Sequence, residues 1–175
     1  EINSINMTLD IVIQEITDVT NYLNNKYKDT PLFFYAISYG GYRTMVAIAR
    51  NEYKNLKGII LVNPAVRMLK ILETLKEFNY KKLSSDATVP MKSSLNKFLS
   101  KKFLDDLYEN DLFKLIYKTK VPIKLLIGKK DDLIPKQDLK DFADLTKCDC
   151  EFLDDSHCVK DDKSWDRIVE IIKQF

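Results

Sequence analysis

Three short apolar runs constrain the fold of this chain more than any other feature. They comprise Leu32–Ile37, Gly58–Val62 and Ile123–Ile127, and Lys124 is the only charged residue within them. Each run is five or six residues long and is bounded by Gly, Pro, Asn or Ser. Nearly continuous apolar runs of this length are typical of strands buried on both faces, as in parallel sheets covered by helices. We therefore expect the runs to form neighbouring strands of one sheet.

Amphipathic segments separate these runs and complete an alternating pattern. Helical spacing of apolar residues predicts helices over Leu9–Tyr27, Tyr42–Asn51, Gln137–Leu145 and Ser164–Gln174, and Cys150–Leu153 reads as a fourth, shorter strand. Helices that alternate with strands imply a parallel sheet with right-handed crossovers. The sequence therefore predicts the α/β class, with a mostly parallel sheet flanked by helices.

Residues 66–120 interrupt this alternation and contain no convincing strand signal. We expect helices at Met68–Leu75 and Leu95–Tyr117, separated by a looser stretch from Lys81 to Lys92. The domain organisation that follows is a core made of residues 1–65 and 121–175, with residues 66–120 as a helical insertion. The apolar side chains of this insertion are expected to pack against the core beneath it, and the alternative is that they line a pocket for an acyl chain.

Composition excludes several function classes. Lys and Arg number 28 and Asp and Glu 26, so the chain has no excess of positive charge with which to attract nucleic acid. No apolar run approaches the roughly 20 residues of a membrane span, and Glu1–Asp10 lacks both a basic leader and an apolar block. Three cysteines cannot all pair with one another, so we expect a reduced, cytoplasmic setting. Nothing in the sequence indicates an oligomeric state.

The candidate nucleophile follows the first predicted strand. Ligands of parallel sheets bind beyond the carboxyl ends of the strands, and Ser38 stands directly after Ile37 and before a predicted helix. A tight strand-to-helix turn exposes such a serine and requires small neighbours two residues on either side. Ala36 and Gly40 meet that requirement, and Gly41 adds room. The alternative is an ordinary turn in which Ser38 caps the helix.

Two further strand ends carry complementary groups. Asp131 and Asp132 follow the third predicted strand, and His157, the only histidine, follows the fourth. Taken alone, either aspartate could cap the next helix, and a lone loop histidine is commonly an ordinary surface residue. Together with Ser38 they give the chain order Ser…Asp…His, and each residue follows a predicted parallel strand. That combination predicts a serine nucleophile with an acid and a base.

These motifs resemble those of the α/β-hydrolase superfamily of serine hydrolases, which includes esterases, lipases and thioesterases. The resemblance covers essentially the whole chain and rests on the turn around Ser38, the strand Gly58–Val62 with its following Asn63-Pro64, the segment Val121–Pro135, and His157. In the family pattern Gly-x-x-Asp-x-x-(Val/Ile)-Pro, the Asp aligns with Asp131, which favours it over Asp132. Residues 66–120 resemble the helical cap or lid of many members, and Ala36 replaces the usual first glycine of the turn.

The resemblance implies an activity. Ser38 would attack the carbonyl carbon of a small-molecule carboxylic ester or thioester, His157 would act as base and acid, and Asp131 would orient His157. The backbone N–H of Tyr39 would donate one bond in the oxyanion hole. No cofactor and no metal are implied. Only 37 residues precede Ser38 and the first residue is Glu1, so the early strands and the loop with the second oxyanion donor are missing. We therefore expect the carboxyl-terminal part of a longer hydrolase.

Three other interpretations remain open. Cys148, Cys150 and Cys158 lie near His157 and could form a zinc site, although Cys-x-Cys is not the usual spacing of structural zinc ligands, and reduced thiols are favoured. The chain could be an inactive hydrolase fold retained as a binding module. The same three catalytic residues could instead cleave an amide or peptide bond, because this chemistry is shared.

Overall fold

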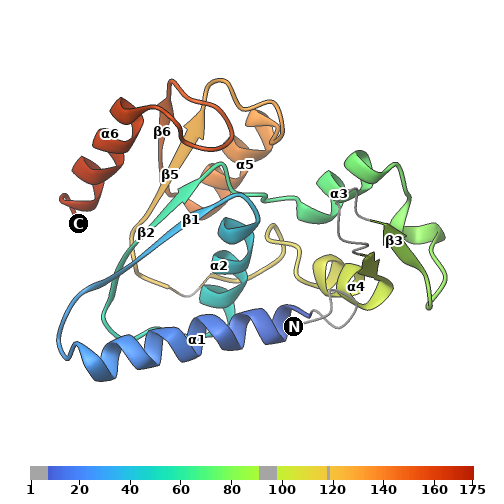
Figure 1. The fold of residues 1–175 in the computed structure, drawn as a ribbon, viewed down its shortest axis with the longest axis horizontal. Helices are drawn as coiled ribbons and strands as arrows, with labels where there is room; N and C mark the ends of the chain where they lie inside the picture. The colour runs from blue at the N-terminus through green and yellow to red at the C-terminus, as the bar shows by residue number, and fades with distance from the viewer. Residues whose placement is uncertain (1–7, 91–97, 118) are drawn as a thin grey trace.

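The computed structural model describes residues 8–90, 98–117 and 119–175 and is built around one parallel sheet (Figure 1). Its four strands are β1 (Leu32–Ile37), β2 (Leu56–Val62), β5 (Ile123–Gly128) and β6 (Asp149–Leu153), in the spatial order β1-β2-β5-β6. All three neighbouring pairs are parallel, with Ile37 opposite Val62 and Ile127 opposite Phe152. The predicted α/β class is therefore confirmed.

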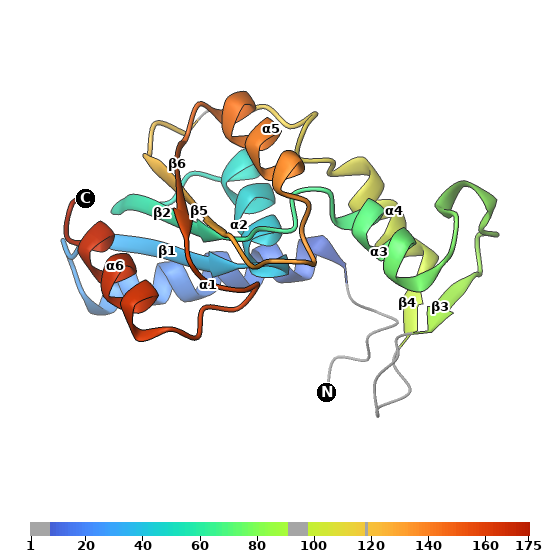
Figure 2. The same ribbon diagram turned by 90° about the horizontal axis from the view of Figure 1, so that it is seen from above.

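Helices cover both faces of this sheet. They are α1 (Leu9–Lys26), α2 (Tyr39–Arg50), α5 (Lys136–Thr146) and α6 (Asp162–Ile172). Successive residues of β2 point to opposite faces: Ile59 and Leu61 join the core beneath α1, α2 and α5, whereas Ile60 and Val62 pack with α6. Figure 2 shows α6 on the other side of the strands from α2 and α5. None of the helices in the described ranges is long and apolar enough to cross a membrane.

The expectation that the first strand is buried on both faces was wrong. In β1 only Ala36 is buried, and Tyr35 is 36% exposed. The reason is the position of β1 at the edge of the described sheet, where β2 is its only partner. Aromatic contacts with the C-terminal segment cover part of β1, because Phe33 lies 5.8 Å from Phe175 and Tyr35 lies 5.8 Å from Trp165 between ring centres.

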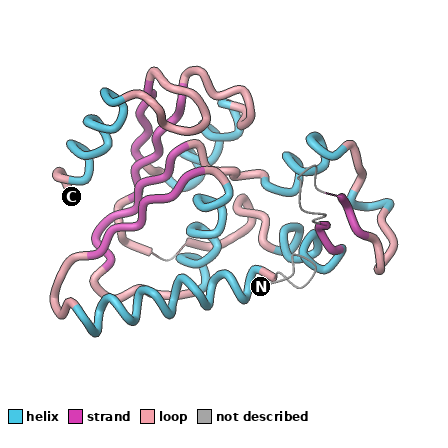
Figure 3. The backbone as a smooth tube through the Cα atoms, viewed as in Figure 1, coloured by secondary structure: helices cyan, strands magenta, loops and turns pink. Residues whose placement is uncertain are grey.

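The segment between β2 and β5 extends to one side of the sheet (Figures 1 and 3). It contains α3 (Met68–Lys76), a 3-10 turn η2 (Tyr80–Lys82), β3 (Thr88–Pro90), β4 (Phe98–Ser100) and α4 (Lys101–Glu109). The expectation of no strand here was wrong, since β3 and β4 form an antiparallel pair. Each has three residues and buries only its middle one, Val89 or Leu99. Strands this short show no alternation in the sequence.

The helix predicted over Leu95–Tyr117 was also wrong in its extent. Within the predicted range the observed helix is α4, which covers Lys101–Glu109, and residues 95–97 of the prediction lie outside the described residues. The Ser100 hydroxyl accepts the Phe103 N–H and begins the helix, which ends at Glu109 before a turn. That turn is held to the core, because the Tyr42 hydroxyl donates to the Asn110 carbonyl at 3.0 Å.

Most apolar side chains of the insertion pack against the core, as expected. Leu72, Phe103, Leu104 and Leu107 belong to the same buried cluster as β2 and α2. The Leu9 N–H also donates to the Asp106 carboxylate at 3.0 Å, which ties α1 to α4.

Candidate active site

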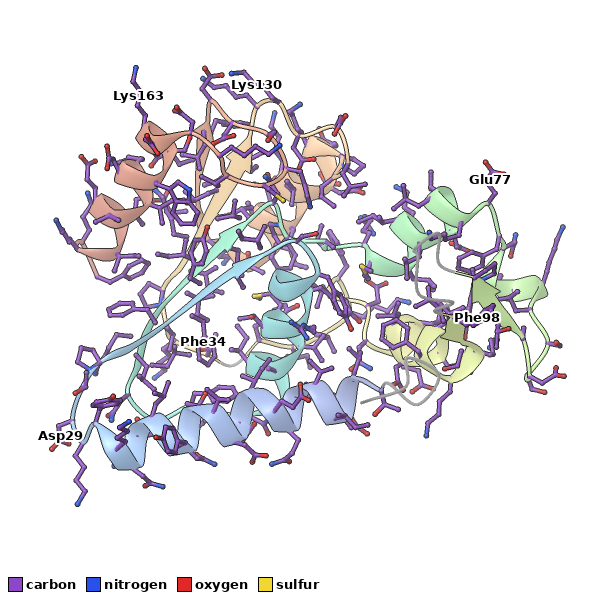
Figure 4. The ribbon with its side chains drawn as sticks, in the orientation of Figure 1. Asp29, Phe34, Glu77, Phe98, Lys130 and Lys163 are labelled. Carbon is purple, nitrogen blue, oxygen red and sulfur yellow. The ribbon has the colours of Figure 1, made fainter. Side chains whose placement is uncertain are left out.

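The candidate residues meet at the carboxyl edge of the sheet. Ser38 follows β1, Asp131 lies in the turn after β5, and His157 lies in the loop after β6. The strands are parallel, so these loops share one edge. In Figure 4 the label on Lys130 marks the loop after β5 at this end of the sheet. Topology thus gathers the three sequence candidates, and contacts between loops set their arrangement.

Ser38 occupies a strained turn between β1 and α2. Its φ is 53° and its ψ is −124°, a conformation that costs a non-glycine residue on the order of 1–3 kcal/mol. The turn is held by the β2 end, since the Ser38 N–H donates to the Val62 carbonyl at 3.1 Å and its carbonyl accepts the Ala65 N–H at 2.9 Å. Helix α2 begins at Tyr39, earlier than the predicted Tyr42, and the Ser38 side chain makes no capping bond. The alternative that Ser38 serves as a side-chain cap of the helix is therefore wrong.

The tightest glycine of this turn is not the expected one. A Cβ atom built on Gly40 would lie 3.9 Å from the Ala36 Cβ, which is an ordinary contact. A Cβ on Gly41 would lie 2.6 Å from the Pro64 Cβ, where α2 crosses the loop after β2. The close approach of helix and loop, rather than the strand before the serine, thus demands a glycine.

Replacing Gly41 with alanine is expected to lower the free energy of unfolding by about 1–3 kcal/mol, the usual cost of overpacking. The added methyl group collides with Pro64, whose ring cannot rotate away. Urea denaturation followed by circular dichroism measures the change, and Gly40→Ala is the matched control. Equal stability of the two variants would contradict the assignment of Gly41 as the tight position.

Asp131 and His157 are in direct contact. The His157 Nδ1 lies 2.9 Å from the Asp131 Oδ2, and the other oxygen of Asp131 accepts the N–H groups of Leu133 and Ile134. The Asp131 side chain is fully buried, whereas the His157 ring is 19% exposed. A carboxylate is an acceptor only, so Nδ1 carries the hydrogen and Nε2 is free to accept a proton. Asp132 is exposed, and α5 begins after Pro135 without a side-chain cap.

The structure places Ser38 and His157 at the same sheet edge but does not join them. Among the described residues, the Ser38 hydroxyl has no hydrogen-bond partner. Burial raises the pKa of Tyr35 in β1, and Cys158, next to His157 in the chain, adds to this shift. Catalytic hydrogen bonds are often long without substrate and shorten in the complex. The Tyr39 N–H, at the first position of α2, has no acceptor within the helix.

Sequence reasoning missed Asn63 as a member of this site. Asn63 directly follows β2, is fully buried and has a φ of 43°. Its side chain donates to the carbonyls of Ser156 and His157 and accepts the Gly128 N–H. The available signal was an Asn-Pro pair directly after a buried strand, at the edge where function was sought.

Asp155 holds the histidine loop from its other side. Its carboxylate accepts the N–H groups of Ser156, Lys160 and Asp161 at 2.8–3.0 Å. Burial opposes ionisation of Asp155, but the N–H groups of Asp161, Ser156 and Lys160 outweigh it and lower the pKa to about 2. The loop that carries His157 is thus closed around an ionised carboxylate.

The Asp155 carboxylate is expected to stabilise the fold in a pH-dependent way. Its pKa is below the unfolded value of about 3.9, so its contribution is complete above that value and is lost as pH falls through about 2. Asp155→Asn should lower the free energy of unfolding by about 1–3 kcal/mol at pH 7. In urea denaturation across pH, the difference from wild type should shrink below about pH 4. Asp154→Asn, at an exposed neighbour, is the control, and a pH-independent difference would contradict the prediction.

A cavity of about 170 Å³ lies between α2, α3 and α4. Met68, Leu69 and Leu107 contribute apolar lining, and Arg67 and Lys70 stand at its wall. Arg67 donates a hydrogen bond to the Asp138 carboxylate of α5 at 3.1 Å, and Lys70 forms an ion pair with it at 3.6 Å. Apolar residues of the insertion therefore both pack against the core and line this pocket, and Leu107 does both.

The three cysteines near His157 in the sequence are free thiols, and Cys148 and Cys150 are half-buried. Burial is the main cause that raises the pKa of both Cys148 and Cys150, which disfavours the thiolate that a metal would bind. Cys158 is exposed. Across residues 8–90, 98–117 and 119–175, no group of three or more His, Cys, Asp or Glu side chains is arranged to hold a metal ion.

Comparisons with known proteins add a family and several structural neighbours. The family model of serine aminopeptidase S33 (Hydrolase_4) matches residues 6–113, a range that includes Ser38 and ends before Asp131 and His157. No curated protein matches the chain.

Solved structures match nearly the whole length of the chain at low identity. Est1E from Butyrivibrio proteoclasticus has a TM-score of 0.73 and 21% identity, over 97% of this chain and 69% of that protein. A putative hydrolase from Agrobacterium vitis S4 has a TM-score of 0.72 and 16% identity, over 96% and 68%. A structure of the metagenome-derived lipolytic enzymes LipS and LipT has a TM-score of 0.68 and 19% identity, over 98% and 76%. These likenesses establish a shared fold.

Proposed function

Because the chain belongs to the serine aminopeptidase S33 family of α/β-hydrolase enzymes, we propose that it cleaves carboxylic esters through an acyl-enzyme on Ser38. The observation that carries the proposal is the 2.9 Å contact between His157 and the buried Asp131. It lies at the sheet edge that also carries a serine in a strained turn. A nucleophile, a base and a group that orients the base are the parts that acyl transfer requires.

The proposed mechanism assigns one role to each group. The Ser38 oxygen attacks the acyl carbonyl while the His157 Nε2 takes its proton, and His157 then returns the proton to the leaving alcohol. Asp131 keeps the hydrogen on Nδ1 and stabilises the charged ring that forms. Water then attacks the acyl-enzyme by the same route in reverse. The Tyr39 N–H, at the positive end of α2, stabilises the oxyanion.

The insertion is proposed to act as the cap of this site, with residues 1–65 and 121–175 as the core. The place of the insertion supports this role, because it leaves the sheet after β2, at the edge where Ser38 lies, and returns at β5. Its apolar side chains line the cavity between α2, α3 and α4, whose lining does not include Ser38, Asp131 or His157. The proposed substrate is a small-molecule acyl ester, and no cofactor is invoked. We place the enzyme in the cytoplasm, since Cys148, Cys150 and Cys158 are all free thiols.

Thioesters and peptide bonds are the competing substrates. A thioester presents the same acyl carbonyl to the same three residues. Cleavage of a peptide bond at an amino terminus is favoured by one observation, the description of the matching family as serine aminopeptidases. Esters are preferred because structural neighbours include lipolytic enzymes, Est1E with bound ferulic acid, and a monoacylglycerol lipase from Paleococcus ferrophilus.

A substrate panel separates these activities. The panel contains p-nitrophenyl esters of increasing acyl length, a feruloyl ester, an acyl thioester and an aminoacyl p-nitroanilide. We expect the esters to be cleaved fastest, and Ser38→Ala and His157→Ala to lose the activity. Faster cleavage of the anilide would favour the aminopeptidase. Equal cleavage by wild type and both variants would overturn the proposed catalytic residues.

A further inference from the structure

We infer that Asn63 is a positioning residue for His157, which it fixes against the acid loop through its side-chain amide. The inference rests on the proposed function, in which His157 is the base. The side-chain bonds of Asn63 go to backbone groups rather than to the serine hydroxyl or the imidazole ring, so its effect is exerted through the backbone that carries the ring.

The Asn63 side chain bridges two loops that carry proposed catalytic residues. Its Nδ2 donates to the carbonyl of His157 at 2.9 Å and to that of Ser156 at 3.2 Å. Its Oδ1 accepts the Gly128 N–H at 2.7 Å, three residues before Asp131. The orientation of the amide is unambiguous, because an N–H faces the oxygen and two carbonyls face the nitrogen. One side chain therefore bridges the start of the acid turn and the base loop, beside the backbone bond from the Lys130 N–H to the Asp155 carbonyl.

The backbone at Val62 and Asn63 also connects this bridge between the loops to the turn that carries Ser38. The Asn63 N–H donates to the Leu126 carbonyl of β5, and the preceding carbonyl, that of Val62, accepts the Ser38 N–H. All three loops are thus joined within one residue of Asn63. A displacement of about 1 Å between catalytic groups can lower a rate about 100-fold.

The position is selective for asparagine. The φ of 43° favours Asn, Asp or Gly. Of these, only Asn supplies both the acceptor for Gly128 and the donors for the two carbonyls. The space is also closed, since a Cβ on Gly128 would lie 2.7 Å from the Ser156 carbonyl oxygen and 3.0 Å from the Asn63 Nδ2. Among the described residues, Asn63 is the side chain that bonds both the Gly128 N–H and the carbonyls of Ser156 and His157, whereas Lys130 joins the same two loops at their exposed rim, through the Asp154 carbonyl.

Asp155 does not duplicate this role. Its carboxylate binds the N–H groups of Ser156, Lys160 and Asp161 and closes the loop upon itself, while its backbone carbonyl accepts the Lys130 N–H of the acid loop at 2.9 Å. Its bonds do not reach β2 or Gly128. The Asp155 carboxylate therefore shapes the histidine loop, and the Asn63 amide attaches that loop to the end of β2.

The single histidine makes the inference testable by NMR without reference to activity. In wild type labelled with ¹⁵N-histidine, we expect one imidazole in the Nδ1–H form, with a strongly downfield Nδ1 proton that Asp131→Asn removes. Asn63→Gly and Asn63→Asp, which both tolerate the backbone conformation, should lose this proton signal and show exchange between ring forms. Folding of each variant is checked by circular dichroism.

Asn110→Ala is the matched control. Asn110 is also buried, and its side chain accepts from Arg50 and donates to the Asp106 carbonyl, in the insertion and away from His157. This variant should keep the wild-type imidazole spectrum. Labelling by a fluorophosphonate should slow about 100-fold in both Asn63 variants and remain unchanged in Asn110→Ala.

The possible outcomes separate the inference from the proposed function. Wild-type spectra and labelling in folded Asn63→Gly and Asn63→Asp would overturn the inference and leave the catalytic residues standing. A wild-type spectrum without the Asp131-dependent proton would overturn both. Labelling that persists in Ser38→Ala would overturn the proposed function alone, because the spectra of the Asn63 variants would still report on the position of His157.

Discussion

Replacing Ser38 with alanine is expected to abolish labelling by a fluorophosphonate and to lower ester hydrolysis by about 10⁴–10⁶-fold. The reason is chemical, because alanine has no oxygen with which to form the acyl-enzyme. The fold should persist, since the turn is held by backbone bonds to Val62 and Ala65 that do not involve the side chain. Gel-based labelling and initial rates with an acyl ester measure both effects.

The control for this substitution is Ser84→Ala, at an exposed serine of the insertion. It should label and hydrolyse at the wild-type rate. Labelling of Ser38→Ala that matches that of Ser84→Ala would show that another residue is the nucleophile.

The second large effect is expected for Asp131→Asn, which should lower turnover by about 10⁴-fold. The amide group cannot hold the His157 ring in the form that presents a free Nε2, because it can offer an N–H to Nδ1 instead of accepting one. The two backbone bonds from Leu133 and Ile134 to the other oxygen are retained, so the loop should keep its shape. Steady-state rates with an acyl ester measure the loss.

Asp132→Asn is the matched control, since it neutralises the adjacent carboxylate, which is exposed. We expect rates close to wild type. A larger loss in Asp132→Asn than in Asp131→Asn would reverse the assignment of the acid that the sequence pattern favours.

The core of the fold could be predicted because its signals are local. Leu32–Ile37 is predicted and observed with the same bounds, and β2, β5 and β6 agree within two residues at each end. The insertion was harder, because β3 and β4 are stabilised by one buried residue each and by their pairing. One buried residue in a three-residue strand leaves no alternation in the sequence, and the pairing of the two strands is not visible there.

The candidate site also contains residues that local signals predict and residues that depend on distant contacts. Ser38, Asp131 and His157 could be chosen from strand ends and residue types alone. Asn63 could not, because its three bonds join residues that are 65 to 94 positions apart in the chain. The distinction between Gly40 and Gly41 also depends on Pro64, a residue of another loop.

The sequence by itself thus determined the alternating α/β order, the strand ends at which a site was expected and the three candidate catalytic residues. Hydrophobic periodicity and turn residues encode these features within short windows of the chain. Only the tertiary structure decided that Asp131 rather than Asp132 contacts His157, that β1 lies at the edge of the described sheet, and that Asn63 joins the loops. These depend on which distant segments pack side by side, and hydrogen bonds between them form only after the sheet has brought the strand ends together.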